Sequence, residues 1–260
     1  YALGEIDRSI ATFTIAAEES KRLPKEYISL DWTAPGNRKE GLVKYFPIGL
    51  SSGISPFNFP MNLAVHKIAP AIAAGCPMIL KPSRSTPLST LELAKIINET
   101  ELPKGAVSIL PTDRESGNQL VTDERFKLLT FTGSPEVGWK MKSNAGKKKT
   151  ILELGGNAGA IITPTADFEM AIKRSLMGAF AYSGKVCIHL QRIYVHEKIF
   201  GKFIEKFLEV TSKLKAGHPT DQDTDISAMI DEDNAIRVEN WVNEAVEQGA
   251  FDKLLARFGN

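Results

Sequence analysis

The sequence predicts an α/β protein with a mostly parallel sheet that helices cover on both faces. Short apolar runs alternate along the chain with longer amphipathic segments, which is the pattern of strands joined by crossover helices. Two of these runs, "MIL" at 78–80 and "AIIT" at 160–163, are unbroken. Unbroken runs are expected of parallel strands that are buried on both faces, so they support a parallel sheet rather than an antiparallel one.

The N-terminal region predicts a helix followed by an exposed hairpin. Apolar side chains between residues 5 and 22 recur at the spacing of one helix face. They are Ile6, Ile10, Phe13, Ala16 and Ala17. From Lys25 to Lys44 the composition shifts to charged and turn-forming residues, including "APGNRKEG", which predicts an exposed strand or hairpin.

The middle of the chain alternates between predicted strands and predicted helices. The apolar runs, which we expect to be strands, lie at 45–55, 76–82, 106–111, 127–133, 150–156 and 159–164. The amphipathic segments between them, which we expect to be wholly or partly helical, lie at 61–75, 86–100, 116–123 and 134–146.

Three further helices are predicted in the C-terminal part. Asp167 is placed to cap a helix whose apolar face runs up to Phe180. Residues 197–215 form a second amphipathic segment, and residues 231–249 form a third with Gly249 as its stop. Two adjacent glycines after a strand, in "ELGG" at 153–156, predict a domain boundary there.

The composition is that of an ordinary globular protein. The 260 residues are 43% hydrophobic and 24% charged, with a formal net charge of +1. This balance indicates neither a nucleic acid nor a membrane surface as partner, and no apolar run reaches the roughly 18 residues of a membrane helix. The N-terminus lacks the features of a signal peptide. Two distant cysteines make no disulfide framework, so we expect a reducing, cytoplasmic location.

Cations and glycines follow two of the predicted strands. Lys81 ends one strand and Arg84 follows it, at the place where open α/β sheets bind ligands, so both cations suit ribose or phosphate oxygens. Gly133 and Ser134 lie between a strand and a helix, where free N–H groups bind phosphate. The chain has no G-x-G-x-x-G fingerprint, so on these residues alone solvated loops and an ordinary strand-to-helix turn stay open as alternatives.

Two further side chains have both a chemical and a structural interpretation. Asn58, in "SPFNFP", is either an amide that donates to a developing oxyanion or a turn residue bonded to its own backbone. Glu153 ends an apolar strand, where a carboxylate needs a partner or acquires an elevated pKa. It is therefore either a general base or a hydrogen-bonded structural carboxylate.

The segment "YSGKVCIHL" at 182–190 surrounds Cys187 with Lys185 and His189. A reactive thiol needs a partly exposed, electropositive setting. On an extended segment, positions two apart face the same side, so Cys187 and His189 would be able to pair in a thiol hydrolase. An inert buried thiol is the alternative, and it is our interpretation of Cys76, which enters a buried strand.

In their order, these motifs resemble those of the aldehyde dehydrogenase superfamily. The series is "SPFNFP", "LKPSRSTP", "FTGSPEVG", "LELGG" and "SGKVC", and "LPKGAVSIL" and "QRIYVH" resemble intervening segments of the family. The 34-residue step from Glu153 to Cys187 also matches the family pattern. The resemblance covers nearly the whole chain. It implies a Rossmann-like parallel sheet as cofactor domain and part of an α/β catalytic domain.

The resemblance also implies a division of the chain. Residues 1–24 and 45–152 would form the cofactor-binding domain, incomplete at its N-terminus, and residues 153–260 would form part of the catalytic domain. Residues 25–44 resemble part of the oligomerisation hairpin of the family. A homo-oligomer, either a dimer or a tetramer, is therefore expected.

The implied reaction is the oxidation of an aldehyde to a carboxylic acid, with no metal. Cys187 would attack the aldehyde carbon, and the Asn58 amide and the Cys187 backbone N–H would hold the oxyanion. Glu153 would activate the water that hydrolyses the resulting thioester. Relatives that transfer the acyl group to coenzyme A tend to lack this carboxylate, so its presence favours an acid as product.

The implied cofactor is NADP or NAD. Lys81 would contact the adenosine ribose, Gly133 and Ser134 would open the helix beside the diphosphate, and Gly117 would let another helix approach the adenine side. Phe57 belongs to the same expected cofactor-binding set. Arg84 stands where NAD-preferring members often have Glu; since Arg clamps a 2′-phosphate, we expect NADP to be favoured.

Three departures from the family pattern affect these expectations. Lys185 stands where Gln is usual, and it would either act on the thiol through its charge or point to solvent. His189 stands where a small residue is common, and we expect it to pack. The chain is much shorter than family members, and neither the E-x-F-G-P motif nor the C-terminal strand follows Gly249. We therefore expect a truncated or incomplete member, in which "KLLARFGN" at 253–260 only begins like a family segment.

The substrate and the activity of the chain itself allow alternatives. The segment "QRIYVHE" resembles that of members acting on small polar aldehydes such as lactaldehyde or glyceraldehyde phosphate. One alternative to aldehyde oxidation is an inactive fragment that binds only nucleotide or partners. The other is the thiol hydrolase built on Cys187 and His189.

Overall fold

A computed structural model of the chain describes residues 1–250 and divides the chain into two compact units. The first unit spans Tyr1–Gly155, and the second begins at Gly156. The division falls between the two adjacent glycines that follow the strand carrying Glu153. The predicted segment "KLLARFGN" lies outside the described residues.

The first unit contains a five-stranded sheet in which every pair of neighbours is parallel. The strands lie in the order β5-β4-β3-β6-β7. They are β3 (Ser51–Ile54), β4 (Met78–Lys81), β5 (Val107–Ile109), β6 (Leu128–Gly133) and β7 (Lys149–Leu154). The five apolar runs predicted between residues 45 and 156 are thus confirmed as strands, each shorter than its run. The chain moves from β3 toward one edge and then from β6 toward the other, so the topological switch point lies between β3 and β6.

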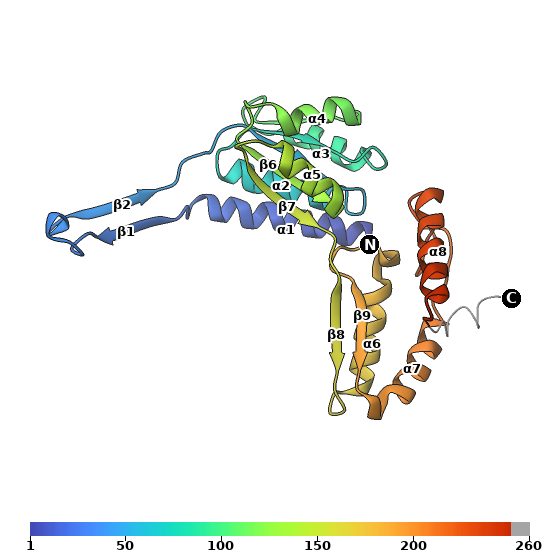
Figure 1. Ribbon diagram of the computed structural model, residues 1–260. Helices are drawn as coiled ribbons and strands as arrows, with labels where there is room; N and C mark the ends of the chain where they lie inside the picture. Colours follow the sequence, from blue (N-terminus) through green and yellow to red (C-terminus); the bar gives the residue numbers. More distant parts are fainter. Residues whose placement is uncertain (251–260) are drawn as a thin grey trace. The chain divides into compact units, whose positions relative to one another are not determined.

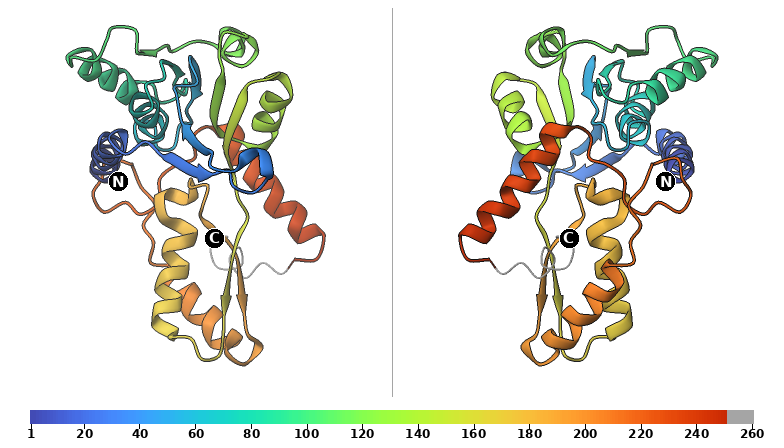
Figure 2. Two further views of the ribbon diagram at one scale, coloured as in Figure 1. Left: turned by 90° about the vertical axis from the view of Figure 1, so that its left-hand side faces the viewer. Right: turned by 90° about the vertical axis from the view of Figure 1, so that its right-hand side faces the viewer.

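Helices cover both faces of this sheet, as predicted. On one face lie α2 (Asn62–Ala73) and α3 (Leu88–Asn98), and on the other lie α4 (Arg114–Thr122) and α5 (Pro135–Asn144), as Figure 2 shows. This arrangement follows from right-handed crossovers, because the chain reverses its direction across the sheet after β5.

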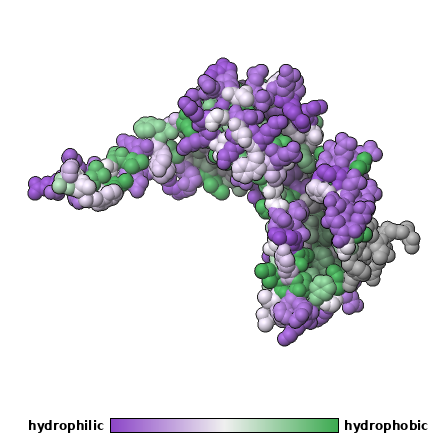
Figure 3. Space-filling model, in the orientation of Figure 1, coloured by the Kyte–Doolittle hydropathy of each residue, from purple (hydrophilic) through white to green (hydrophobic). Residues whose placement is uncertain are grey.

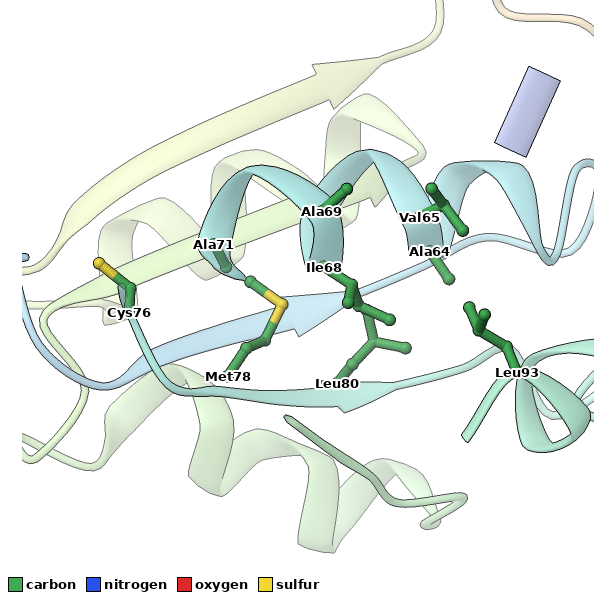
Figure 4. Close-up of a cluster of buried hydrophobic side chains, with 9 residues drawn as sticks. All are labelled: Ala64, Val65, Ile68, Ala69, Ala71, Cys76, Met78, Leu80 and Leu93. Atoms are coloured by element: carbon green, nitrogen blue, oxygen red, sulfur yellow. The ribbon is translucent and has the colours of Figure 1, made fainter. Parts of the chain in front are cut away.

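The main core lies between α2 and β4. Figure 4 shows Ile68 of α2 beside Met78 and Leu80 of β4, and the same cluster includes Val65 of α2 and Leu93 of α3. Ile68 and Leu80 are completely buried. A smaller cluster on the opposite face joins Val121 of α4, Leu129 of β6 and Ala145. Cys76 packs in the main core as an ordinary apolar residue, as the sequence predicts.

Helix α1 (Ala2–Ser20) lies along α2 and supplies its missing cap. The Glu5 carboxylate accepts hydrogen bonds from the backbone N–H groups of Met61, at 2.9 Å, and Asn62, at 3.0 Å. The first N–H groups of a helix have no partner within the helix, so a carboxylate there satisfies them and also complements the helix dipole. Phe13 and Ala16 of α1 pack against the main core.

The predicted excursion between residues 25 and 44 is confirmed as a hairpin. Strands β1 (Lys25–Ser29) and β2 (Glu40–Lys44) pair antiparallel with each other and form a sheet of their own, seen at the left of Figure 1. A short 3-10 turn, η1 (Ala34–Gly36), lies at the tip. The hairpin leaves several large apolar side chains exposed, and Figure 3 shows hydrophobic surface along it.

Within residues 156–250, the second unit is built on two parallel strands and three α-helices. Strand β8 (Ala158–Ile162) pairs with β9 (Leu190–Val195). The helices are α6 (Phe168–Phe180), α7 (Glu197–Thr211) and α8 (Glu232–Glu247). Ile162, Ile172 and Phe203 form the centre of a core between β8, α6 and α7.

The helix boundaries of the second unit follow local signals in the sequence. The Asp167 carboxylate caps α6 by accepting from the Met170 N–H at 3.0 Å, as predicted. After α8, Gly249 has a positive φ of 93°, and the N–H groups of Gly249 and Ala250 donate to Val246 and Ala245. This pair of bonds is the Schellman motif, so the predicted role of Gly249 as a stop is confirmed.

Candidate active site

The carboxyl edge of the five-stranded sheet brings most of the predicted site residues together. In the strand register, Ile54 of β3 is paired with both Lys81 and Phe131, and Thr132 of β6 is opposite Glu153. Parallel strands end at the same edge of a sheet, and ligands of open α/β sheets bind outside that edge near the switch point. The loop with Asn58 follows β3, so it lies at this edge beside the switch point.

The loop that carries Asn58 is held from the side by two threonines. Thr86 Oγ1 donates to the Phe57 carbonyl at 3.2 Å, and Thr90 Oγ1 donates to the Pro60 carbonyl at 2.9 Å. Thr90 is completely buried, while Phe57 and Asn58 are half-buried. The backbone on both sides of Asn58 is therefore anchored to α3 and to the segment just before it.

Gly117 makes room for the side chain of Lys81. A Cβ atom at Gly117, in the first turns of α4, would lie 2.8 Å from both Cδ and Cε of Lys81. Such an approach is closer than van der Waals contact allows, so the absence of a side chain lets Lys81 lie along α4. The structure thus links two predicted cofactor residues by a direct contact that the sequence does not reveal.

Lys81 belongs to a group of cations that includes one residue missed in the sequence. Burial lowers the pKa of Lys81, and the charges of Arg84 and Arg114 lower it further, whereas Asp113 opposes them. Arg114 is the first residue of α4, and Asp113 caps this helix by accepting from the Ser116 N–H at 2.7 Å. Arg114 lies far from Lys81 in the chain, and the pairing of β4 with β5, the strand that precedes α4, brings their charges close.

The turn from β6 to α5 depends on close packing around two glycines. A Cβ at Gly133 would lie 2.4 Å from the ring of Phe131, and one at Gly138 would lie 2.5 Å from Leu154. Ser134 is the N-cap residue of α5, followed by Pro135 at the first helical position. The glycines therefore let the start of α5 approach the ends of β6 and β7, where Gly133 and Ser134 were predicted to meet a diphosphate.

Lys67 is a second functional candidate that sequence reasoning passed over. It is only 5% exposed, and its ammonium group donates to Thr130 Oγ1 at 3.2 Å and to Thr132 Oγ1 at 2.7 Å. Burial lowers the pKa of Lys67 to about 8, while the charge of Glu153 acts in the opposite direction. In the sequence, Lys67 only interrupts an apolar segment; the signal that would have identified it is its position on the α2 face that packs on the sheet.

Glu153 itself is exposed, which corrects one expectation. The sequence predicts a carboxylate at the end of an apolar strand that needs a partner or has a raised pKa, but the β7 side chains alternate and Glu153 faces solvent. Its negative charge raises the pKa of Lys67 and of His66, in opposition to burial, which lowers both pKa values. A buried cation therefore accompanies Glu153 in the first unit.

In the second unit, Cys187 lies in a turn and not on an extended segment. The His189 N–H donates to the Val186 carbonyl at 3.1 Å, which closes a turn around Cys187 and Ile188. The prediction that Cys187 and His189 share one side of a strand is therefore wrong. His189 Nδ1 lies 2.6 Å from the Val186 carbonyl, so the ring bonds its own turn. The Cys187 thiol is exposed and free.

The residues before Cys187 have an unusual backbone. Tyr182, Ser183 and Gly184 all have positive φ values, of 57°, 54° and 71°. Lys185 follows, and its ammonium group donates to the Ala228 carbonyl at 2.6 Å. Lys185 thus reaches toward a neighbouring loop of the same unit.

Residues 1–250 show no group of three or more His, Cys, Asp or Glu side chains arranged to hold a metal ion. Within the same residues, every helix is too short or too polar to cross a membrane.

The fold and the ordered motifs define a doubly wound α/β protein with a separate unit that carries an exposed cysteine. The chain belongs to the aldehyde dehydrogenase family, whose model matches residues 1–255. The resemblance stated from the motifs is thereby confirmed.

Relatives and solved structures agree with this assignment. The chain is 45% identical to 3-sulfolactaldehyde dehydrogenase of Priestia aryabhattai, over 96% of this chain and 53% of the relative. It is 40% identical to lactaldehyde dehydrogenase of Methanococcus aeolicus, over 94% and 52%. A structure of aldehyde dehydrogenase 21 from Physcomitrella patens, in complex with the reaction product succinate, matches with a TM-score of 0.91 at 51% identity, over 95% and 52%.

A second solved structure is that of glyceraldehyde-3-phosphate dehydrogenase GapN from Methanocaldococcus jannaschii, complexed with NADP. It matches with a TM-score of 0.88 at 38% identity and covers 94% of this chain and 54% of that one. The chain therefore spans about half the length of the curated relatives and solved structures that it matches.

Proposed function

We propose that this chain serves the NAD(P)+-dependent oxidation of a small polar aldehyde to a carboxylic acid. The observation that carries the proposal is that Asn58, Lys81, Gly133 and Glu153 lie at one edge of the parallel sheet, beside its switch point. The relatives support it, because the names of two of them specify lactaldehyde and 3-sulfolactaldehyde, which are small and polar.

The residues of the first unit fit a dinucleotide. Lys81, Arg84 and Arg114 supply positive charge at the edge where ribose and phosphate groups bind in sheets of this class. A guanidinium cannot accept hydrogen bonds from ribose hydroxyls, but it binds a phosphate with two donors. We therefore propose that NADP is preferred to NAD. When bound, the nicotinamide ring accepts the hydride that leaves the substrate carbon.

Cys187 is the proposed nucleophile. Its thiolate attacks the aldehyde carbon and gives a thiohemiacetal, whose oxyanion is held by the Asn58 side-chain amide and the Cys187 backbone N–H. Removing one such donor typically costs on the order of 10²–10³ in rate. Loss of hydride from the former aldehyde carbon leaves a thioester on Cys187.

Glu153 is the proposed base of the second half-reaction. Its carboxylate takes a proton from the water that attacks the thioester, and the Cys187 thiolate is released with a carboxylic acid.

The proposal is tested by nucleotide binding and by reduction of the cofactor. Calorimetry should give tighter binding of NADP+ than of NAD+, and lactaldehyde should then produce reduced cofactor, detected by its absorbance. Cys187→Ala should abolish reduction and leave NADP+ binding unchanged. Full turnover by Cys187→Ala, or equal binding of both nucleotides, would contradict the assignment of the nucleophile or of the cofactor, respectively.

The cations at the edge of the sheet are compatible with a second function, in which the chain binds nucleotide without turnover. In that case calorimetry gives NADP+ binding while no aldehyde yields reduced cofactor. A thiol hydrolase would instead cleave esters or thioesters and bind neither nucleotide. The bond between His189 and its own turn argues against this hydrolase.

We also propose a homo-oligomer, a dimer or a tetramer, that forms through the β1–β2 hairpin. Tyr27, Trp32 and Leu42 on this hairpin are between 56% and 78% exposed, which is unusual for large apolar residues close to one another in one element. A reducing, cytoplasmic location is proposed from the two free cysteines, since an exposed thiol persists best where disulfides do not form.

A further inference from the structure

The loop before Cys187 carries three successive residues in the left-handed region. Tyr182 and Ser183 have φ, ψ values of 57°, 35° and 54°, 34°, and Gly184 has a φ of 71°. Glycine adopts this region freely, but for Tyr and Ser it is unfavourable and persists only where surrounding contacts hold it. Contacts with other residues must therefore hold this loop.

The segment 227–228 supplies contacts that hold this loop. The Ser227 N–H donates to Ser183 Oγ at 2.9 Å, and the two serine hydroxyls lie 3.2 Å apart. Lys185 Nζ donates to the Ala228 carbonyl at 2.6 Å. Ser183 and Lys185, on either side of Gly184, thus hydrogen-bond to the adjacent residues Ser227 and Ala228. We call these contacts the Ser183–Lys185 clamp.

The segment gripped by the clamp is itself fixed. The Ile226 N–H donates to the Lys215 carbonyl at 3.0 Å, the Gly217 N–H donates to the Ile226 carbonyl at 3.0 Å, and Ala216 pairs with Ile226 as a parallel bridge. Ser183 and Gly184 also line an open pocket of about 400 Å³ together with Ala216 and Ile226 of this segment.

We propose that Ser183 and Lys185 are positioning residues that hold the Cys187 turn in the geometry of an attacking nucleophile. Cys187 lies two residues after Lys185, so a loop that leaves its left-handed conformation reorients the thiol and the Cys187 backbone N–H together. The proposal rests on the proposed role of Cys187. It also explains Lys185 without a charge effect on the thiol, because its ammonium group is directed to Ala228.

Four variants of the full chain distinguish a clamp from a charge effect of Lys185. Ser183→Ala and Lys185→Met each remove one half of the clamp. Ser183→Gly removes the same hydroxyl as Ser183→Ala but relieves the unfavourable φ, and Lys185→Arg keeps a long cationic donor. Three readouts are used: amide hydrogen exchange at Lys185, His189 and Ser227, the pH profile of Cys187 alkylation by iodoacetamide, and the release of p-nitrophenolate as p-nitrophenyl acetate acylates the thiol.

The clamp predicts a definite pattern. Ser183→Ala and Lys185→Met should each raise exchange at the three amides at least tenfold and slow acylation by about tenfold, with the midpoint of the alkylation profile unchanged. Ser183→Gly should lose clearly less than Ser183→Ala, and Lys185→Arg should stay within about twofold of the unmodified chain. Buried Cys76 should stay unreactive throughout, which shows that the fold of the first unit is intact.

Two results would overturn the proposal. In the first, the Ala and Met variants leave exchange and acylation unchanged. In the second, Lys185→Met alone has an effect and moves the alkylation midpoint to higher pH, which means that Lys185 acts through its charge. None of the three readouts requires aldehyde turnover, so a failure of the clamp is distinguishable from a failure of the proposed oxidation.

Discussion

Lys67 keeps its ammonium group inside the first unit, with the hydroxyls of Thr130 and Thr132 as its hydrogen-bond acceptors. Burial disfavours the charged form and lowers its pKa from 10.5 to about 8. The group is therefore charged at neutral pH but titrates well below an exposed lysine. An internal cation is costly to keep, and the two threonine hydroxyls and the charge of Glu153 offset part of that cost.

The depressed pKa of Lys67 makes stability depend on pH in a defined window. Between pH 8 and 10.5 the unfolded chain keeps the proton that the folded chain has lost. The free energy of unfolding therefore rises with pH in this window, because the cost of the buried charge disappears. The 2.5-unit difference corresponds to about 3 kcal/mol. Lys67→Met removes this dependence. Urea unfolding should show that the stability of the variant relative to the unmodified chain falls by up to about 3 kcal/mol from pH 7 to 10.5, whereas a constant difference would contradict it.

Gly117→Ala tests the contact between α4 and Lys81. The new Cβ would lie 2.8 Å from Cδ and Cε of Lys81, and this flexible side chain has to move away. Alanine in a helix is favoured over glycine by about 0.5–1 kcal/mol, so the melting temperature should be unchanged or higher. Binding of NADP+ should nevertheless weaken by about tenfold in calorimetry. A matched control is Gly201→Ala in α7, where a Cβ meets no atom within 4 Å and nucleotide binding should not change.

At the scale of elements, local patterns identify most strands and helices of both units. The five strands of the parallel sheet lie in short apolar runs that are visible in the sequence itself. The helix caps at Asp167 and Gly249 likewise depend only on neighbouring residues. Local patterns did not predict the turn around Cys187. The left-handed loop before it makes hydrogen bonds to residues 227–228, which are distant in the chain.

The candidate site likewise contains residues that the sequence predicts and residues that only the structure reveals. Asn58, Lys81, Gly133 and Glu153 lie at a common edge because each follows or ends a parallel strand, which the sequence pattern already implies. The sequence did not predict Arg114 and Lys67, because each interacts with a residue on another element. Arg114 acts on Lys81 of β4, and Lys67 interacts with Glu153 of β7. Conversely, the exposure of Glu153 depends on how β7 is covered, which periodicity does not determine.

Helix α1 provides an element-scale prediction, because its Glu5 carboxylate caps α2 from outside. Glu5→Ala leaves the Met61 and Asn62 N–H groups without this acceptor and removes a favourable charge at the helix start. The loss of such a cap typically costs about 1–2 kcal/mol. Urea unfolding should show this loss, while Asp7→Ala on the same helix should change stability by less than about 0.5 kcal/mol. Equal effects of both substitutions would refute the capping role.

At the scale of the whole molecule, the proposed chemistry is distributed over both units. The residues proposed for the nucleotide and for water activation belong to the unit Tyr1–Gly155, and the proposed nucleophile belongs to the unit that begins at Gly156. Each unit has its own hydrophobic core. A substitution in one unit leaves the core of the other unit intact, so nucleotide binding and thiol reactivity without nucleotide should be separable within one chain.

Lys81→Met and Cys187→Ala test whether nucleotide binding and thiol reactivity are independent. Each variant should impair one of the two properties and leave the other unchanged. Lys81→Met removes the cation at the end of β4 and should weaken NADP+ binding at least tenfold, while the rate of Cys187 alkylation without nucleotide stays within about twofold. Cys187→Ala should leave the NADP+ dissociation constant within about twofold. Lys142→Met is a matched control, since Lys142 lies over Trp139 near the end of α5 and away from the site edge. If Lys81→Met altered thiol reactivity without nucleotide, the two units would be coupled before the cofactor binds, and the proposed division of labour between them would be wrong.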